Sequence, residues 1–347
     1  MRSTMTFRFV GPAAFFTLIA AAHGEGLKIG DAAPRLSIGK WIGGDAVDIT
    51  KADPADVFVI TFWQPSQHFS RFYTSTMTHV QKQFKDRRVR VIAVTAEQKE
   101  TVQNFLDSGW RRGVRFTIGV DQRGRTARRW EAAPDISPMV ATYIVKDGRI
   151  TWVGQHLEGL DTHVAEALGD EAYVADARKY ESRLTRFNEA YKAEQWDKAL
   201  SILDKLMAFK PNDTRLNNSR YIILANKKRD AKAAEPWKSI LLARCEDAYA
   251  LNELAWGILT EDMWRDCRDL SFAKAVAEKA MALTDHRNAA IVDTYARALW
   301  DTGDWAGAIE WQKRALELCK VDPTSAEFLG QIQETLEAYQ NRINRGI

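Results

Sequence analysis

Hydrophobic and polar positions follow one pattern before about residue 170 and another after it. In the first part, short apolar runs rich in β-branched and aromatic residues alternate with amphipathic stretches of helical period. Runs of this kind predict buried strands over residues 57–63, 89–96 and 115–121. Helices are expected over residues 72–84, 99–110 and 126–132.

The last strands of this first part form a predicted β-hairpin over residues 140–155. Its turn signal is the pair Asp147-Gly148, which lies between two alternating apolar runs. Strands separated by helices imply βαβ units, and the hairpin adds antiparallel pairing. The sequence therefore predicts an α/β domain with a mixed sheet flanked by helices.

From about residue 170 onward the strand pattern is replaced by amphipathic helices with short polar breaks. The segments 196–211, 250–285 and 291–320 are predicted to form helix hairpins. Small residues stand where two helices must pack closely, at Ala199, Ala273, Ala277, Ala280, Ala308 and Ala315. Pro211 and Pro323 end two of the segments. Self-similar hairpins predict an all-α helical repeat domain.

The N-terminus has the pattern of a secretory leader. Arg2 and Arg8 precede an apolar run from Phe9 to Ala22 that is short for a membrane span and ends in small residues. An uncleaved anchor is the alternative. We expect a signal peptide over residues 1–24, a first domain over 25–168 and a second over 169–347. The mature protein is then exported, periplasmic or extracellular, and meets the membrane only through its leader.

Composition and charge argue against nucleic acid as a partner. The 347 residues are 46% hydrophobic and 27% charged, which is typical of a globular protein, and the net charge is +3. Seven arginines do cluster in one segment, at Arg111, Arg112, Arg115, Arg123, Arg125, Arg128 and Arg129. A solvated face is favoured over an anion site for them, because the total charge is nearly balanced.

Residues that ligate metals or carry redox chemistry are sparse. The three cysteines, Cys245, Cys267 and Cys319, all lie in the last third and match neither a CxxC pair nor a zinc site. His156 and His163 are seven residues apart, but two ligands do not make a metal site. We therefore expect no metal and no cofactor.

Several segments of the first half, in the right order, resemble one superfamily. GDAAPRLSIGKW (30–41), VITFWQPSQHFSRF (59–72) and ATYIVKDGRITWVGQ (141–155) are similar to the opening strand, the active-site turn and the closing hairpin of thioredoxin-like proteins. The resemblance covers most of residues 27–160. It is to exported redoxin or TlpA-like thiol–disulfide oxidoreductases, and it implies a thioredoxin-like fold.

The active-site turn departs from the family pattern. The alignment of Phe62-Trp63 and Arg71 places Gln67 and Ser70 at the two vestigial cysteine positions. The family's chemistry needs a thiolate at this helix start, and a Gln amide is no nucleophile. A Ser70–His68 dyad is disfavoured, since residues two apart point to different sides of a helix.

The second half resembles tetratricopeptide-like (TPR) repeats. AYALNELAWGIL (248–259), FAKAVAEKAMALTDHRN (272–288) and VDTYARALWDTGDWAGAIEWQKRALEL (292–318) are similar to such repeat helices, and 195–211 fits an earlier repeat. The resemblance implies a concave face, built by the first helix of each hairpin, that binds a protein or peptide partner. Trp264, in an interrupting loop, is expected to be exposed for binding.

Two main functions follow as hypotheses. The first is a non-catalytic scaffold that binds a protein or peptide through the TPR concave face and through a thioredoxin-like groove. The groove residues are Trp63, Gln67, His68, Ser70 and Pro138, where Pro138 is the candidate for the family's cis-proline and Val140 the alternative. The second is an enzyme, a thiol–disulfide oxidoreductase or peroxide-detoxifying redoxin, that uses non-standard cysteines. A purely structural spacer is a third option.

Overall fold

The computed structural model describes residues 26–346 except 68–69, 108–113, 122, 131–140, 156, 158, 322–324 and 326–327. The predicted signal peptide therefore lies outside the described residues, as do His68, Pro138 and His156. Within the described ranges, no helix is both long and apolar enough to cross a membrane.

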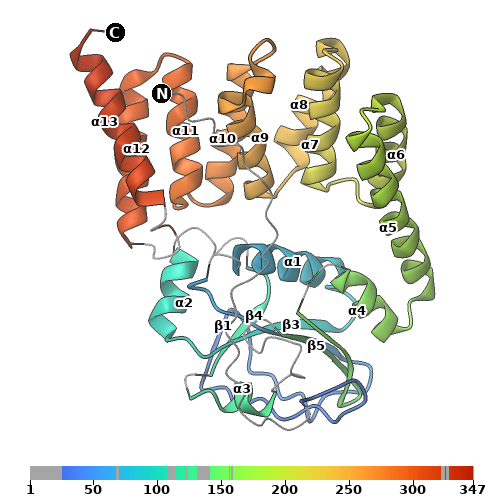
Figure 1. The fold of residues 1–347 in the computed structure, drawn as a ribbon. Coiled ribbons are helices and arrows are strands. Elements are labelled where there is room, and N and C mark those ends of the chain that lie inside the picture. Colours follow the sequence, from blue (N-terminus) through green and yellow to red (C-terminus); the bar gives the residue numbers. More distant parts are fainter. Residues whose placement is uncertain are drawn as a thin grey trace.

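A six-stranded mixed sheet forms the first part of the chain (Figure 1). Its strands are β1 (Lys40–Ile42), β2 (Val57–Phe62), β3 (Val89–Thr95), β4 (Thr117–Val120), β5 (Thr142–Lys146) and β6 (Arg149–Gly154). They lie in the order β1-β4-β3-β2-β5-β6. β3 runs parallel to both β2 and β4, whereas β1 and the β5–β6 hairpin pair antiparallel. The expected mixed sheet and closing hairpin are confirmed.

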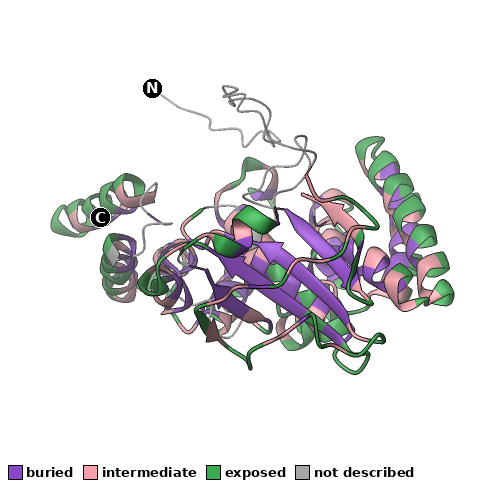
Figure 2. Cartoon of the chain, turned by 90° about the horizontal axis from the view of Figure 1, so that it is seen from below, coloured by how far each residue is buried: buried purple, intermediate pink, exposed green. Residues whose placement is uncertain are grey.

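Strand β2 shows why these residues form a central strand. Val57 and Val59 face one side of the sheet, and Phe58, Ile60 and Phe62 face the other. Successive side chains alternate between the faces of a strand, so a continuous apolar run is stable only when both faces are covered. Figure 2 shows the central strands largely buried. The sheet therefore separates two apolar cores.

Helices cover the two faces unequally. α1 (Ser70–Gln83), α2 (Lys99–Phe105) and α4 (Leu160–Leu168) pack on the face of Val57, and α3 (Arg125–Arg129) lies on the other face. In α1, the apolar positions Met77 and Val80 are spaced to share the side that meets the sheet, and both are fully buried. The amphipathic pattern thus decides which side of α1 is inside.

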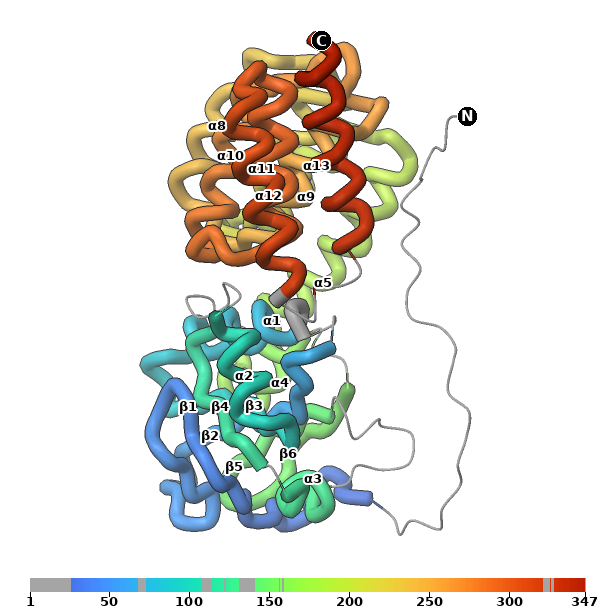
Figure 3. Tube along the Cα trace, turned by 90° about the vertical axis from the view of Figure 1, so that its left-hand side faces the viewer, coloured from blue at the N-terminus to red at the C-terminus, as the bar shows by residue number. Residues whose placement is uncertain are grey.

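The second part of the chain is entirely helical in the described ranges. Its helices are α5 (Glu171–Lys192), α6 (Trp196–Phe209), α7 (Thr214–Ile222), α8 (Ala231–Arg244), α9 (Ala248–Thr260), α10 (Leu270–Leu283), α11 (Ala289–Asp301), α12 (Trp305–Val321) and α13 (Leu329–Asn344). A π-helical turn (Ile223–Lys227) extends α7, and a 3₁₀ turn (Asp262–Trp264) follows α9. Successive helices pair as hairpins that stand side by side (Figures 1 and 3).

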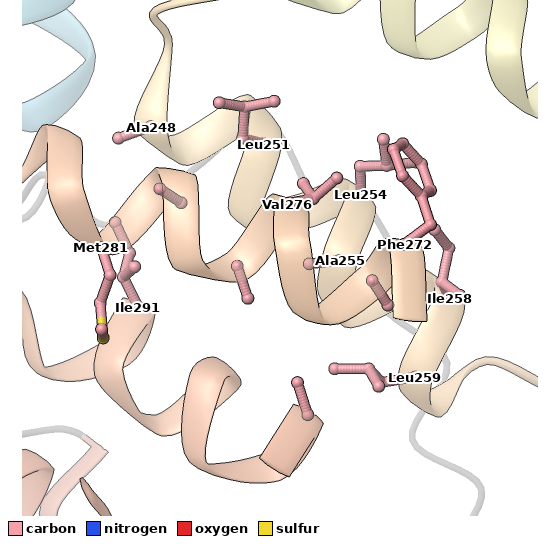
Figure 4. Close-up of a cluster of buried hydrophobic side chains, with 14 of the residues drawn as sticks. Ala248, Leu251, Leu254, Ala255, Ile258, Leu259, Phe272, Val276, Met281 and Ile291 are labelled. Atoms are coloured by element: carbon pink, nitrogen blue, oxygen red, sulfur yellow. The ribbon is translucent and has the colours of Figure 1, made fainter. Parts of the chain in front are cut away.

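Small and branched residues hold these hairpins together. Leu251 and Leu254 of α9 pack with Phe272 and Val276 of α10 and with Ile291 of α11 in one continuous core (Figure 4). The alanines singled out in the sequence are all fully buried, as close helix packing requires: Ala199, Ala273, Ala277, Ala280, Ala308 and Ala315. The all-helical class of this region is confirmed.

The two parts are in direct contact through the helices on one face of the sheet. Tyr249 of α9 packs against the core beneath α1. Lys82 of α1 forms a 3.0 Å ion pair with Glu246, and Asp161 of α4 forms one of 2.9 Å with Lys210. Helix α4 ends at Leu168 and α5 begins at Glu171, so the predicted boundary lies at a short, packed connection.

Candidate functional site

The turn between β2 and α1 is the segment whose sequence resembles the active-site turn of thioredoxin-like proteins. Strands β2 and β3 are parallel, so their carboxyl ends meet at one edge of the sheet. The Trp63 N–H donates to the Val94 carbonyl at 2.8 Å, and the Gln67 N–H donates to the Gln64 carbonyl at 3.0 Å. These backbone bonds fix the start of the turn.

A serine and a glutamate hold the middle of this turn. The hydroxyl of Ser66 donates to one carboxylate oxygen of Glu97, and the Ser66 N–H donates to the other at 3.2 Å. Ser66 follows β2 and Glu97 follows β3, so the pair joins the ends of two neighbouring strands. Sequence reasoning missed both residues. The signal that points to them is a polar residue after each of two adjacent parallel strands.

The predicted groove residues are only partly brought together in the described ranges. Gln67 is exposed on the turn, and Ser70 is the first residue of α1. His68 and Pro138 lie outside the described residues. The described part of the turn contains no cysteine, and disulfide exchange by proteins of this fold uses a cysteine thiolate.

Trp63 lies in the core and not on a groove surface. Its side chain is 2% exposed, and its ring meets Phe105 and Phe116 edge to face at centroid distances of 5.1 and 6.3 Å. The residue directly after a central strand still belongs to the buried layer, because α1 and α2 close over it. Gln67 is therefore the exposed side chain of the turn, and Trp63 supports the turn from beneath.

We expect Glu97→Ala to lower the free energy of unfolding by about 1 kcal/mol, because two hydrogen bonds from Ser66 to a partly buried carboxylate are lost. Amide exchange at Ser66 should accelerate at the same time. Denaturant unfolding and hydrogen exchange measure both effects. The control is Gln98→Ala, since the exposed Gln98 makes no side-chain capping bond to α2. Equal effects of the two variants would contradict a specific role for Glu97.

The three cysteines lie in the helical region and outside this turn. None of the three is in a disulfide. Cys245 and Cys319 are buried, and burial raises the pKa of the Cys245 thiol above its usual value. Cys267 is partly exposed near the Nδ2 atom of Asn226 at 3.8 Å. A buried thiol with a raised pKa is a poor nucleophile.

The histidine and the arginine cluster that the sequence analysis singled out can both be placed in the fold. His163 stacks on Trp152 at 4.8 Å and pairs with Glu166 at 3.0 Å, which accounts for its position without a metal. Five of the seven clustered arginines are described, and all five are exposed: Arg115, Arg123, Arg125, Arg128 and Arg129. This is the solvated face that the sequence favoured.

A groove of about 360 Å³ runs along the helical region between α5, α7 and α9. Each of these is the first helix of a hairpin. The groove is lined by Tyr191, Arg215, Asn218, Ser219, Ile222, Glu253, Leu254, Gly257, Glu261, Met263 and Trp264. Apolar walls with a few polar groups are typical of a site that binds a peptide or small molecule.

The expectation that Trp264 is exposed is wrong. The side chain is 2% exposed and lies parallel to Tyr221, with the ring centroids 6.0 Å apart. The interrupting loop folds into the 3₁₀ turn Asp262–Trp264, and this turn carries the indole into the core at the base of the groove. A tryptophan that is exposed is Trp305, at 48%, at the start of α12.

Comparison with known proteins finds a family resemblance in the α/β part. Residues 29–153 match the model of the AhpC/TSA family. The matched segment contains all six strands up to Val153 and the turn with Ser66, Gln67 and Glu97. The helical region lies outside the match.

Similar solved structures cover about two fifths of the chain. A protein described as thiol:disulfide interchange protein DsbE from Chlorobium tepidum is 20% identical over 41% of this chain and 99% of its own, with a TM-score of 0.35. A thioredoxin-like superfamily protein is also 20% identical, over 40% and 96%, with a TM-score of 0.35. Mycobacterium tuberculosis AhpC is 17% identical over 42% and 96%, with a TM-score of 0.33. No curated protein matches the chain.

Proposed function

We propose that this protein is an exported, non-catalytic scaffold that binds an extended polypeptide in the groove of its TPR-like helical region. The α/β domain then serves as a second, degenerate binding module. Export rests on the leader pattern of residues 1–24. Two linked surfaces of modest affinity give usable avidity when one partner engages both.

The observation that carries this proposal is the composition of the turn after β2. Gln67 and Ser70 occupy the positions of the family's cysteines, and residues 29–153 contain no cysteine at all. The turn is held instead by the Ser66–Glu97 pair. Reduction of a disulfide or a peroxide by this family requires a thiolate, so the same fold without one keeps only its capacity to bind.

The groove between α5, α7 and α9 supports the binding role. It has apolar walls from Ile222 and Leu254 and polar groups from three helices. Extended peptides bind well to such surfaces, because side-chain pockets give specificity while the rigid hairpins need little reorganisation.

Activity assays separate this proposal from the enzymatic alternative. We expect the mature protein to reduce neither insulin disulfides nor hydroperoxides above the rate in buffer. A variant with Cys245→Ser, Cys267→Ser and Cys319→Ser should behave identically. Turnover that disappears in this variant would instead establish an enzyme whose nucleophile lies in the helical region.

Panning a random peptide library against the immobilised mature protein tests the binding role itself. We expect the library to become enriched in certain peptides. Free full-length protein in solution should compete with the immobilised protein for these peptides. A library that enriches nothing over several rounds argues for a structural spacer, and the proposed binding function then fails.

A further inference from the structure

The groove between α5, α7 and α9 carries two carboxylates that form no ion pair in the described part of the chain. Glu253 and Glu261 both line it, and both side chains are exposed to it. Neither forms a side-chain hydrogen bond or an ion pair among the described residues. Arg215 also lines the groove, but in the described part of the chain it is in no ion pair with either glutamate. The lining therefore has two negative charges against one positive charge.

The surroundings of Glu253 disfavour its charge in the empty groove. The groove walls partly remove water from it and raise the pKa of its carboxyl group, an effect to which Asp247 adds and which Arg215 opposes. An opposite charge brought in by a ligand reverses this penalty. Glu253 is thus placed to gain more from a cationic ligand than a carboxylate on an open surface gains.

A second, independent feature points to a ligand with hydrogen-bond donors. Asn218 lines the groove and is 7% exposed. Its Nδ2 donates to the Ala250 carbonyl at 2.6 Å, which fixes the orientation of the amide. Its Oδ1 is then buried with no hydrogen-bond partner in the described residues. Buried acceptors of this kind are rare in folded proteins and favour a donor from outside.

The rest of the lining suits a long aliphatic stem. Ile222, Leu254 and Tyr191 form apolar walls beside the carboxylates. Gly257 lies within α9, and a Cβ atom placed there would meet only the carboxyl end of Glu261, at 3.7 Å. Packing therefore does not require a glycine at this position. A methyl group there would take up space beside Glu261 in the groove wall.

We propose that this groove recognises an arginine or lysine side chain of an extended peptide, with its cation held by Glu253 and Glu261. The stem lies against Ile222 and Leu254, beside Asn218 in the groove wall. This proposal rests on the proposed binding function and specifies its ligand class. Lysine and arginine combine a long methylene stem with a cationic donor head, which the groove's walls and acceptors complement.

The test compares two labelled pentapeptides, Ala-Ala-Arg-Ala-Ala and the same peptide with citrulline in place of arginine. Citrulline keeps the size and stem of arginine and removes the charge. We expect the arginine peptide to bind the full mature chain about tenfold more tightly, and this preference to weaken with added salt. Fluorescence anisotropy and, for weak binding, NMR titration give the two dissociation constants.

Variants assign the preference to particular residues. Glu253→Gln should reduce the affinity for the arginine peptide about tenfold and leave the affinity for the citrulline peptide unchanged. Glu310→Gln is the matched control, because Glu310 is exposed on α12 outside the groove. Gly257→Ala should weaken both peptides yet raise the melting temperature by about 2–4 °C, since alanine favours a helix interior.

The outcomes separate this inference from the function on which it rests. Equal binding of the two peptides overturns the preference for a cation, as does a library that enriches peptides without arginine or lysine, and peptide binding itself then stands. If neither peptide binds at millimolar concentration and the library enriches nothing, both the inference and the binding function fail.

Discussion

Replacing Trp63 with alanine is expected to lower the free energy of unfolding by about 3–5 kcal/mol, the usual cost of removing a large aromatic side chain from a packed core. The ring of Trp63 is 2% exposed and fills the space between β2, α1 and α2, against Phe105 and Phe116. Neighbouring side chains on strands and helices have little freedom to close such a cavity. Denaturant unfolding followed by circular dichroism measures the loss.

Two further variants show whether burial is the cause. Trp63→Phe keeps an aromatic ring in the cavity and removes an indole N–H that lacks a hydrogen-bond partner in the described residues, so its cost should stay below about 1.5 kcal/mol. Trp305→Ala is the control, because Trp305 is 48% exposed, and it should cost well under 1 kcal/mol. A Trp63→Ala variant as stable as Trp305→Ala would mean that the indole leaves the core and is available to a partner.

The sequence alone was sufficient for the α/β domain because its signals are local. The apolar run of β2 specifies a strand that is buried on both faces. In the hairpin, Asp147 and Gly148 adopt positive φ angles of 49° and 67°, which two-residue turns between twisted strands require. Neither feature depends on a distant residue, and both are confirmed.

Helix boundaries in the second part were only coarsely predicted, although the sequence contained a usable signal. Five aspartates and one asparagine cap the N-termini of α5, α7, α8, α9, α10 and α11: Asp170, Asp213, Asp230, Asp247, Asp269 and Asn288. Each side chain accepts a backbone N–H of the first turn, which is the reason that these residue types begin helices. Each of these residues therefore marks the start of an individual helix.

The candidate site was harder to predict because it depends on residues far apart in the chain. Ser66 and Glu97 are 31 residues apart and meet only after two strands pair. The burial of Trp264 depends on Tyr221, which lies 43 positions earlier in the chain. The residues around Trp264 are mostly polar, so the local sequence gave no sign that its side chain is buried. The groove likewise combines Tyr191, Asn218 and Glu253 from three helices. Such juxtapositions follow from tertiary packing and not from periodicity.

The second large effect is expected for Asp161→Asn, at about 3 kcal/mol of lost stability. Asp161 of the α/β domain accepts a hydrogen bond from the Lys210 ammonium at 2.9 Å and another from the Tyr173 hydroxyl at 2.8 Å. The side chains of Asp161 and Lys210 are only 12% and 22% exposed. Asparagine keeps the size of the side chain but leaves the largely buried charge of Lys210 without its carboxylate partner. Denaturant unfolding measures the loss, and Lys210→Met in the Asp161→Asn background should recover much of it.

The pH dependence of the same pair gives an independent check. Burial acts to raise the pKa of Asp161, but the charge of Lys210 and the hydrogen bonds from Lys210 and Tyr173 outweigh it and lower the pKa below its usual value. The ionised form is therefore favoured in the folded state. Its contribution is complete above the unfolded-state pKa of about 3.9 and is lost as the pH falls from there through the folded-state pKa. The difference in stability between the parent and Asp161→Asn should shrink over this acidic range.

Asp176→Asn, which removes the exposed partner of Lys179, should change stability by less than about 1 kcal/mol at any pH. A pH-independent difference for Asp161→Asn would show that its charge is not what joins α4 to the helical region.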